Sequence, residues 1–249
     1  MRYILLLTVL LASNAFAAPD FGETMAQAKQ GDANAQYNLG RMYVYGEGVQ
    51  KNDAEAVKWF RKSAEQGDAR AQDSLGVMYD NGQGVPENDA EAVKWFRKSA
   101  EQGDARAQTS LGFMYAGGNG VPENNAEAVK WYRKAANQGH AKAQFDLGIM
   151  YDQIIVPEND AEAVKWFRKA ANQGHTKAQL NLGLMYAMGN GVPENNIRAY
   201  VWWSMAKTQG YEEAADNLDI LKPQMTKQQI AEGQALAAQC YESNYKDCD

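Results

Sequence analysis

A five-residue motif, Leu-Gly-x-Met-Tyr, occurs five times along this chain at a nearly constant spacing, beginning at Leu39, Leu75, Leu111, Leu147 and Leu182. A tryptophan follows each copy, and successive tryptophans are 36, 36, 35 and 36 residues apart: Trp59, Trp95, Trp131, Trp166 and Trp202. A fixed period of this length is the signature of a repeat architecture, in which each unit buries its apolar face against its neighbours. The chain is therefore expected to fold as a stack of similar units.

Within each unit the pattern predicts two helices. In the second unit, Ala71, Leu75, Met78 and Tyr79 recur at i, i+4, i+7 and i+8, which is one face of a helix. A glycine pair and a proline follow and mark a connection. The second helix is predicted to begin at an Asn-x-x-Glu capping box, as at Asn88, and to end at a glycine. Between these signals the tryptophans are expected to be core residues.

These helix starts divide the chain into segments. We expect a signal peptide at 1–17, an N-terminal capping helix at 18–31, repeats at 32–67, 68–103, 104–139, 140–174 and 175–210, and C-terminal capping helices with a tail at 211–249. The two half-units at the ends are expected to cover the apolar faces of the terminal repeats.

The first residues have the pattern of a secretory signal. Arg2 precedes an apolar run at Ile4–Ala12, broken only by Thr8, and Ala15-Phe16-Ala17 has the small-x-small form that signal peptidase accepts. The run is too short for an ordinary membrane span. We therefore expect cleavage near Ala17, no membrane span, and a periplasmic or secreted protein.

Charge and cysteine content restrict the partners. The net charge is −6, and loss of Arg2 with the signal makes it −7 (−6 minus one positive charge). Binding to nucleic acid or anionic lipid needs clustered cations, so neither is expected. The cysteines, Cys240 and Cys248, lie in the tail and are predicted to form a disulfide in an oxidising compartment. We expect no metal and no cofactor.

The 36-residue step, the Leu-Gly-x-Met-Tyr series, the Gly-x-Gly loop and an Ala-x-x-Trp-Phe/Tyr-x-x-Ala series resemble the Sel1-like repeat (SLR) class, a relative of the tetratricopeptide repeat. The resemblance covers residues 21 to about 222. It implies an all-α fold: a right-handed α/α superhelical solenoid of five 36-residue helix-turn-helix repeats with capping helices, whose first helices line the concave surface. It also implies an adaptor that assembles complexes, and many bacterial members of this class are exported.

Two units depart from the pattern. The fourth lacks the Gly-x-Gly, and Ile154 and Ile155 stand in its loop, either packed on a neighbour or forming a contact surface. The fifth has Asn195-Asn196-Ile197-Arg198 in place of the capping box and doubles its tryptophan at Trp202-Trp203.

Candidate binding residues are those that vary between units on one face of the first helices. Four cations form a predicted ridge: Arg70, Arg106, Lys142 and Lys177. Beside it, a predicted apolar strip contains Phe113, Phe145, Ile149, Leu180 and Leu184. Such a face suits a peptide with acidic and hydrophobic side chains. The alternative is that the apolar column only packs against adjacent first helices.

The second helices carry a repeated charge pattern, interpreted as a solvated face with pairs such as Glu91 with Lys94 and Arg97 with Glu101. His140 and His175 occupy equivalent positions beside capping glycines, where a helix-end role is favoured over metal binding.

Enzyme signatures are weak. Ser204-x-x-Lys207 and Ser243-x-x-Lys246 match the loose Ser-x-x-Lys pattern of penicillin-recognising enzymes, but the supporting Ser-Asp-Asn and Lys-Thr-Gly elements are absent. The leading hypothesis is a non-enzymatic exported scaffold that binds a protein or peptide through its concave face. The alternative is a cell-envelope protein that binds or hydrolyses β-lactams, related to cysteine-rich members of the class, whose cysteine pair in each repeat this chain lacks.

Overall fold

The computed structural model describes residues 20–152, 159–246 and 248. The predicted signal peptide, its cleavage site near Ala17, and the loop isoleucines Ile154 and Ile155 lie outside these residues. In the described part all regular structure is helical, as the sequence predicts. The helices are α1 (Phe21–Lys29), α2 (Ala33–Tyr45), α3 (Asp53–Glu65), α4 (Ala69–Asp80), α5 (Asp89–Glu101), α6 (Ala105–Gly117), α7 (Asn125–Asn137), α8 (Ala141–Asp152), α9 (Asp160–Ala171), α10 (Thr176–Met188), α11 (Asn196–Thr208), α12 (Glu212–Leu221), a short 3-10 helix η1 (Lys222–Gln224), and α13 (Lys227–Glu242).

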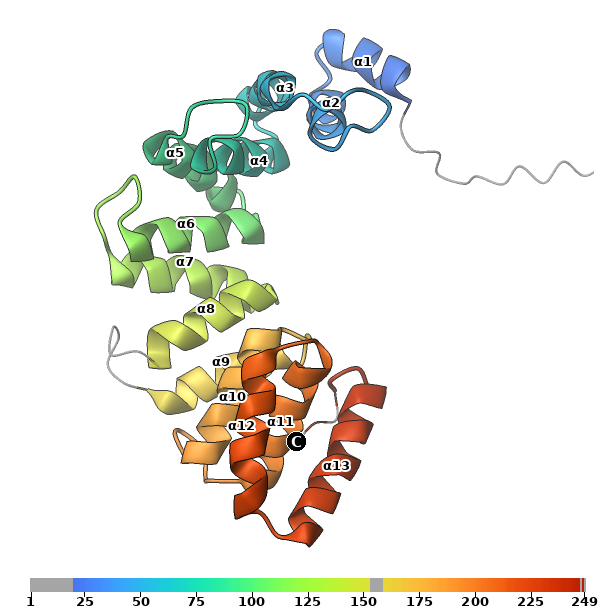
Figure 1. Cartoon of the computed structure of the whole chain (residues 1–249). Helices are drawn as coiled ribbons and strands as arrows, with labels where there is room; N and C mark the ends of the chain where they lie inside the picture. The colour runs from blue at the N-terminus through green and yellow to red at the C-terminus, as the bar shows by residue number, and fades with distance from the viewer. Residues whose placement is uncertain (1–19, 153–158, 247, 249) are drawn as a thin grey trace, which may run out of the picture.

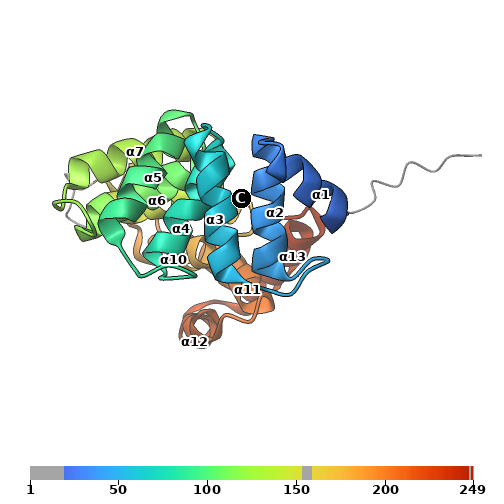
Figure 2. The same cartoon turned by 90° about the horizontal axis from the view of Figure 1, so that it is seen from above.

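Each repeat is a pair of helices, from α2 with α3 to α10 with α11, and each second helix also packs on the first helix of the next repeat. Figure 1 shows the pairs following one another along an arc. Seen from above, in Figure 2, the first and last helices overlap, although Figure 1 places them at opposite ends of the arc. The arrangement is an α/α solenoid, in which each repeat touches only its neighbours.

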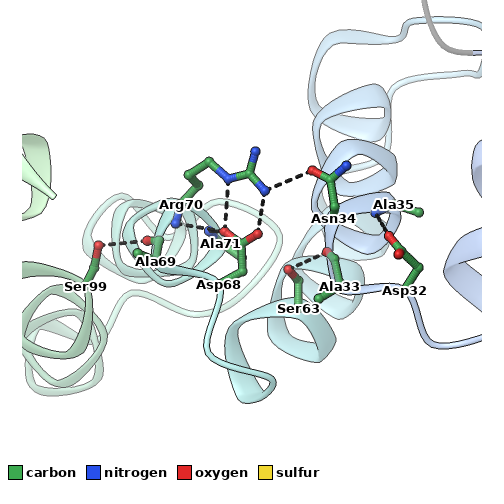
Figure 3. Close-up of polar contacts among 10 residues, drawn as sticks. All are labelled: Asp32, Ala33, Asn34, Ala35, Ser63, Asp68, Ala69, Arg70, Ala71 and Ser99. Atoms are coloured by element: carbon green, nitrogen blue, oxygen red, sulfur yellow. Dashed lines mark hydrogen bonds and ion pairs between the residues drawn. The ribbon is translucent and has the colours of Figure 1, made fainter. Parts of the chain in front are cut away.

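The first helix of a repeat begins at an aspartate or histidine. The side chains of Asp32, Asp68 and Asp104 accept hydrogen bonds from backbone amides in the first turns of α2, α4 and α6, and Figure 3 shows the first two. His175 does the same for α10, since its Nδ1 lies 3.2 Å from the amide of Ala178. These caps satisfy amides that the helix leaves without partners.

The second helices have only half of the predicted capping box. The side chains of Asn52, Asn88, Asn124, Asn159 and Asn195 accept from the amide three residues on. The glutamates do not reach back, because they form ion pairs with the lysine three residues later, as Glu91 does with Lys94 at 3.2 Å. The amide of Asn88 instead donates to the carbonyl of Tyr79 at the end of the preceding helix. A complete box is present at Thr226 and Gln229, which begin α13.

The glycine of each Leu-Gly-x-Met-Tyr motif receives an aromatic ring from the second helix of the same repeat. A Cβ added to Gly76 would lie 2.6 Å from the ring of Phe96, and the same holds for Gly148 and Phe167. The other pairs are Gly40 with Phe60, Gly112 with Tyr132, and Gly183 with Trp203. The absence of a side chain therefore sets how closely the two helices approach. We call these five pairs the glycine–aromatic contacts.

The tryptophans are core residues, as predicted: all five are buried, with at most 8 % exposed. A lysine three residues further along lies over the ring of Trp59, Trp95, Trp131 and Trp166, with Lys134 Nζ 3.9 Å from the Trp131 ring centroid. The arginines of the second helices bond to the next repeat. This corrects the interpretation that they only form pairs, such as Arg97 with Glu101, on a solvated face. Arg97 donates to the hydroxyl of Tyr115, and equivalent bonds join Arg61 to Tyr79, Arg133 to Tyr151, and Arg168 to Tyr186.

Buried glutamines connect successive repeats. Gln108 on α6 donates to the carbonyl of Ala100 at the end of α5, at 3.0 Å, and accepts from Gln138 at the end of α7, at 2.8 Å. The same pair of bonds occurs in every repeat, centred on Gln36, Gln72, Gln144 and Gln179. A hydroxyl adds a further bond in two repeats, where Ser63 and Ser99 donate to Ala33 and Ala69 (Figure 3).

The ends are covered by partial repeats. Helix α1 packs against α2, and α13 packs against α11. The ring of Tyr200 on α11 lies against Gly233, where an added Cβ would be 2.8 Å away. Cys240 at the end of α13 is joined to Cys248 by a disulfide, which holds the tail against the last helices. Within the described residues, no helix combines the length and apolar character needed to cross a membrane.

We expect Gly76→Ala to lower the free energy of unfolding by about 1–3 kcal/mol, because the new methyl group would overlap the Phe96 ring. Gly117→Ala is the matched control, since Gly117 is also helical but exposed, and its added Cβ would meet only the Asn119 side chain. Urea unfolding followed by circular dichroism measures both. Equal effects of the two substitutions would contradict the proposed role of the glycine–aromatic contacts.

We expect Gln108→Ala to destabilise the protein by roughly 1–3 kcal/mol, because it leaves the partners of a buried side chain without their hydrogen bonds. Gln138→Ala removes one of the same bonds from an exposed position, where water replaces it. The same urea experiment should therefore show a smaller effect for Gln138→Ala. If that variant were the less stable of the two, the buried glutamines would not be what couples the repeats.

Candidate functional site

The inner face of the solenoid is formed by the first helices and contains two hollows of about 470 Å³ each. One lies between α4, α6 and α8 and is lined by residues that include Asp73, Phe113 and His140. The second lies between α2 and α4, with Tyr37 and Val44 among its lining residues. We call this surface, made of α2, α4, α6, α8, α10 and α12, the first-helix face.

The structure places the predicted cations on this face, but three of the four have carboxylate partners there. Arg70 forms an ion pair with Asp68 at 2.6 Å and donates to Asn34 of the preceding repeat (Figure 3). Arg106 lies 3.3 Å from Asp73, and Lys142 lies 2.8 Å from Asp146. Lys177 is exposed. The positive charge of the ridge is therefore largely neutralised by neighbouring carboxylates. Comparing equivalent positions between repeats did not reveal these pairs.

The predicted apolar strip divides into two parts. Phe113 is 51 % exposed and Leu184 is 44 % exposed, so both project from the face. Leu180 is buried, and Phe145 packs between the rings of Phe167 and His175, with centroid separations of 5.9 Å and 4.7 Å. Ile149 is half-buried against the same core. Both interpretations of the strip thus apply, each to different residues: Phe113 and Leu184 are available for binding, whereas Phe145 and Leu180 pack against neighbouring helices.

Three further exposed apolar residues lie on the first-helix face and were not identified from the sequence: Tyr45, Met188 and Ile220. Tyr45 and Met188 are four residues beyond Arg41 and Leu184, hence on the same side of their helices. Ile220 occupies on α12 the position that Leu184 occupies on α10. Aligning the C-terminal half-unit through Ala214 and Leu218 would have revealed it.

One position of the first helices varies from repeat to repeat, and we call it the varying column: Tyr37, Asp73, Thr109, Phe145 and Leu180. Side chains of this column contact the beginning of the next first helix. Arg70 lies over the ring of Tyr37 at 4.5 Å, and His175 stacks on Phe145. Thr109 donates to the carbonyl of Ala105 and lies 2.9 Å from His140 Nδ1. Burial lowers the pKa of both histidines, with Lys142 adding to the effect at His140. Their neutral rings serve the joints between repeats, in agreement with the predicted helix-end role.

Asp73 is the exception in this column. Its side chain is 6 % exposed, and within the described part of the chain its ion-pair partner is the Arg106 guanidinium. Burial raises the pKa of Asp73 to about 6, nearby Arg106 opposes the rise, and Asp104 adds to it. The sequence signal was available, because an acidic residue stands where the other repeats carry Tyr37, Thr109, Phe145 and Leu180.

The residues considered for chemistry lie on or beside helices α11 and α13 and at the starts of first helices. Among the described residues, no group of three histidine, cysteine, aspartate or glutamate side chains is placed to hold a metal. Ser204 is half-buried in the middle of α11, and Lys207 is exposed near its end. Ser243 and Lys246 lie just after α13, where the Ser243 hydroxyl accepts from the Lys246 amide.

Comparison with known proteins gives one consistent result. The family model for the Sel1 repeat matches residues 33–68, 69–104, 105–140, 141–175 and 176–211. A Sel1 repeat protein from Oxalobacter formigenes is 38 % identical with a TM-score of 0.74, over 80 % of this chain and 79 % of that one. The protective antigen c5321 of uropathogenic Escherichia coli, which has an SLR fold, is 37 % identical with a TM-score of 0.79.

That second match covers 88 % of this chain but only 51 % of the E. coli protein. A Sel1-like repeat-containing protein of Acanthamoeba polyphaga mimivirus, L18, is 57 % identical over 37 residues, which are 15 % of this chain and 6 % of the viral protein. Such a match of a single repeat reflects the repeat and not the whole protein. The five matched repeats and the two solved structures agree with the helix pairs described above, and the chain belongs to the Sel1 repeat family.

Proposed function

We propose that this protein is an exported adaptor that binds a protein or peptide along its first-helix face. One observation carries the proposal: the large exposed apolar side chains of the described repeats are all on first helices. Tyr45, Phe113, Leu184 and Met188 belong to α2, α6 and α10, and in the C-terminal half-unit Ile220 on α12 continues the series, while Tyr241 on α13 is exposed outside it. The described second helices, α3, α5, α7, α9 and α11, have none. Apolar groups gathered on one hollowed face are typical of an interaction surface.

The charges of the face support recognition by shape and apolar contact more than by net attraction. Arg70, Arg106 and Lys142 are paired with carboxylates of the same face. These pairs, in which an exposed cation meets a largely buried carboxylate, leave the surface nearly neutral. The partner is therefore expected to bring apolar side chains to Phe113 and Leu184, and its own net charge is of less importance.

Two features support export. The amino-terminal sequence has the basic, apolar and small-residue parts of a signal peptide. The disulfide between Cys240 and Cys248 fits an oxidising compartment. The periplasm or the extracellular space is the proposed location.

We expect the double variant Phe113→Glu/Leu184→Glu to lose a partner that the wild-type protein captures from its native cell envelope. The two carboxylates would stand at the exposed apolar positions, where burial in an interface is costly. The loss is expected to exceed tenfold when the captured partner is purified and its affinity is measured by calorimetry.

The matched control is Asn137→Glu/Asn172→Glu, which adds the same two charges at exposed ends of second helices. It should capture the partner as the wild-type protein does, and circular dichroism should show that both variants remain helical. Equal capture by all three proteins would contradict binding through the first-helix face.

A further inference from the structure

The hollow between α4, α6 and α8 contains a buried hydrogen-bond acceptor that the chain leaves unused. Asp73 lines the hollow, its side chain is 94 % buried, and its Oδ2 lies 3.3 Å from the Arg106 guanidinium. Its other oxygen, Oδ1, has no hydrogen-bond partner among the described residues. Such a buried unsatisfied group in a native structure calls for an explanation, because it is costly to retain.

The equivalent side chains of the other repeats do not leave such an acceptor. The Tyr37 ring lies beneath Arg70, and Phe145 lies against His175. The Thr109 hydroxyl donates within α6 and meets His140, and Leu180 is apolar and buried. The unused acceptor is thus a feature of the second repeat and not of the fold.

The walls of the hollow define what could reach this acceptor. Val77, Phe96, Phe113 and Met114 form an apolar lining, and the volume of about 470 Å³ is in the range of small ligand pockets. Phe113 is half-exposed, so one face of its ring is free to pack against an incoming group. An apolar ring would therefore fill the space next to Asp73.

The charges around the hollow favour a neutral donor over a cation. Asp73 pairs with Arg106, and Lys142 pairs with Asp146, while burial lowers the pKa of His140 and keeps that ring uncharged at neutral pH. A lysine or arginine brought to Asp73 Oδ1 would have to approach Arg106, which already pairs with the same carboxylate. A hydroxyl or indole N–H meets no such repulsion.

We propose that this hollow takes one tyrosine or tryptophan side chain of the protein partner. The aromatic ring packs between Phe113 and Val77, and its O–H or N–H donates to Asp73 Oδ1. Aromatic side chains with a polar end are frequent anchors of protein interfaces, since one end is apolar and the other makes a directed hydrogen bond. This inference rests on the proposed function and specifies which side chain the first-helix face selects.

The raised pKa of Asp73 indicates that its carboxylate destabilises the folded protein at neutral pH, as is expected of a residue whose role is in binding. Its pKa in the folded protein, about 6, is above the ordinary value of 3.8. As pH rises from 4 to 6 the unfolded chain releases this proton before the folded protein does, so stability is lost and remains lost at pH 7. The charged and titratable groups that face Asp73 from α2, α4, α6 and α8 are Arg41, Asp80, Asp104, Arg106, His140 and Lys142.

We therefore expect Asp73→Asn to raise the melting temperature at pH 7 and to have a smaller effect near pH 4, where Asp73 is protonated in the folded protein and about half protonated in the unfolded chain. Thermal unfolding between pH 4 and pH 8 measures the difference. Asp219→Asn, on the exposed side of α12, is the control and should change little. A lower melting temperature for Asp73→Asn at pH 7 would mean that the carboxylate stabilises the fold, and would remove this support.

The test of the proposal is a titration of the full chain with N-acetyl amides of tyrosine, tryptophan, phenylalanine and lysine, followed by NMR of methyl-labelled methionine. The tyrosine and tryptophan amides should shift the Met114 methyl resonance. The phenylalanine amide, which lacks the donor, should bind at least about tenfold more weakly, as expected for a lost hydrogen bond to a charged group. The lysine amide should not displace the tyrosine amide.

Asp73→Leu supplies the decisive comparison, because leucine occupies the equivalent position at Leu180 without disturbing the fold. It should abolish the preference for tyrosine over phenylalanine. Equal binding of the two amides to the wild-type protein, or an unchanged preference in Asp73→Leu, would overturn the proposal. A partner captured through Phe113 and Leu184 would still support the adaptor function in that case, so the two proposals fail separately.

Discussion

The glycine–aromatic contacts determine the geometry on which the rest of this solenoid depends. A first helix without a side chain at Gly76 accepts the flat ring of Phe96, so the two helices of the repeat approach closely and in one register. Two helices of about three turns each cannot bury a core alone. The contact therefore sets the shape of a unit, while the glutamine bonds and the Arg–Tyr bonds set how one unit meets the next. Repetition of both kinds of contact produces the regular arc.

That regularity leaves one surface free to vary. Second helices are occupied by tryptophans on the inside and by lysines and arginines that cover or bridge them on the outside. On the first helices, by contrast, the residues facing the hollow are not needed for the stack at every repeat. Phe145 and Leu180 are used for packing, whereas Phe113 and Leu184 are not. The difference between a structural and a recognising residue thus follows the position on the helix: Phe145 and Leu180 are equivalent to Asp73, whereas Phe113 and Leu184 are equivalent to Val77, four residues further on.

The repeat pattern was sufficient to predict the helices, the asparagine caps of the second helices, the buried tryptophans and the α/α stacking, because each follows from spacing along one chain. The pattern was insufficient wherever two columns meet in space. The pairing of Arg106 with Asp73 joins positions 33 residues apart, and the bond from Arg97 to Tyr115 joins positions 18 apart. The glutamates of the second helices were wrongly assigned to the backbone, since a lysine one turn away offers a stronger, charged partner. Ile220 was missed because its half-unit lacks the Met-Tyr end of the motif.

Asp73 shows how a repeat protein can acquire specificity without altering its framework. An array of near-identical units gives similar surfaces along its inner face, and apolar contact alone distinguishes poorly between partners of similar size. A carboxylate with one unused oxygen changes this for one hollow, because only a side chain with a donor supplies the hydrogen bond that this oxygen lacks. Partners are then distinguished by the hydrogen bond to Asp73 that a side chain without a donor cannot make. Because each repeat contacts only its neighbours, the cost of burying Asp73 falls on the second and third repeats, and the glycine–aromatic contacts on either side remain unchanged.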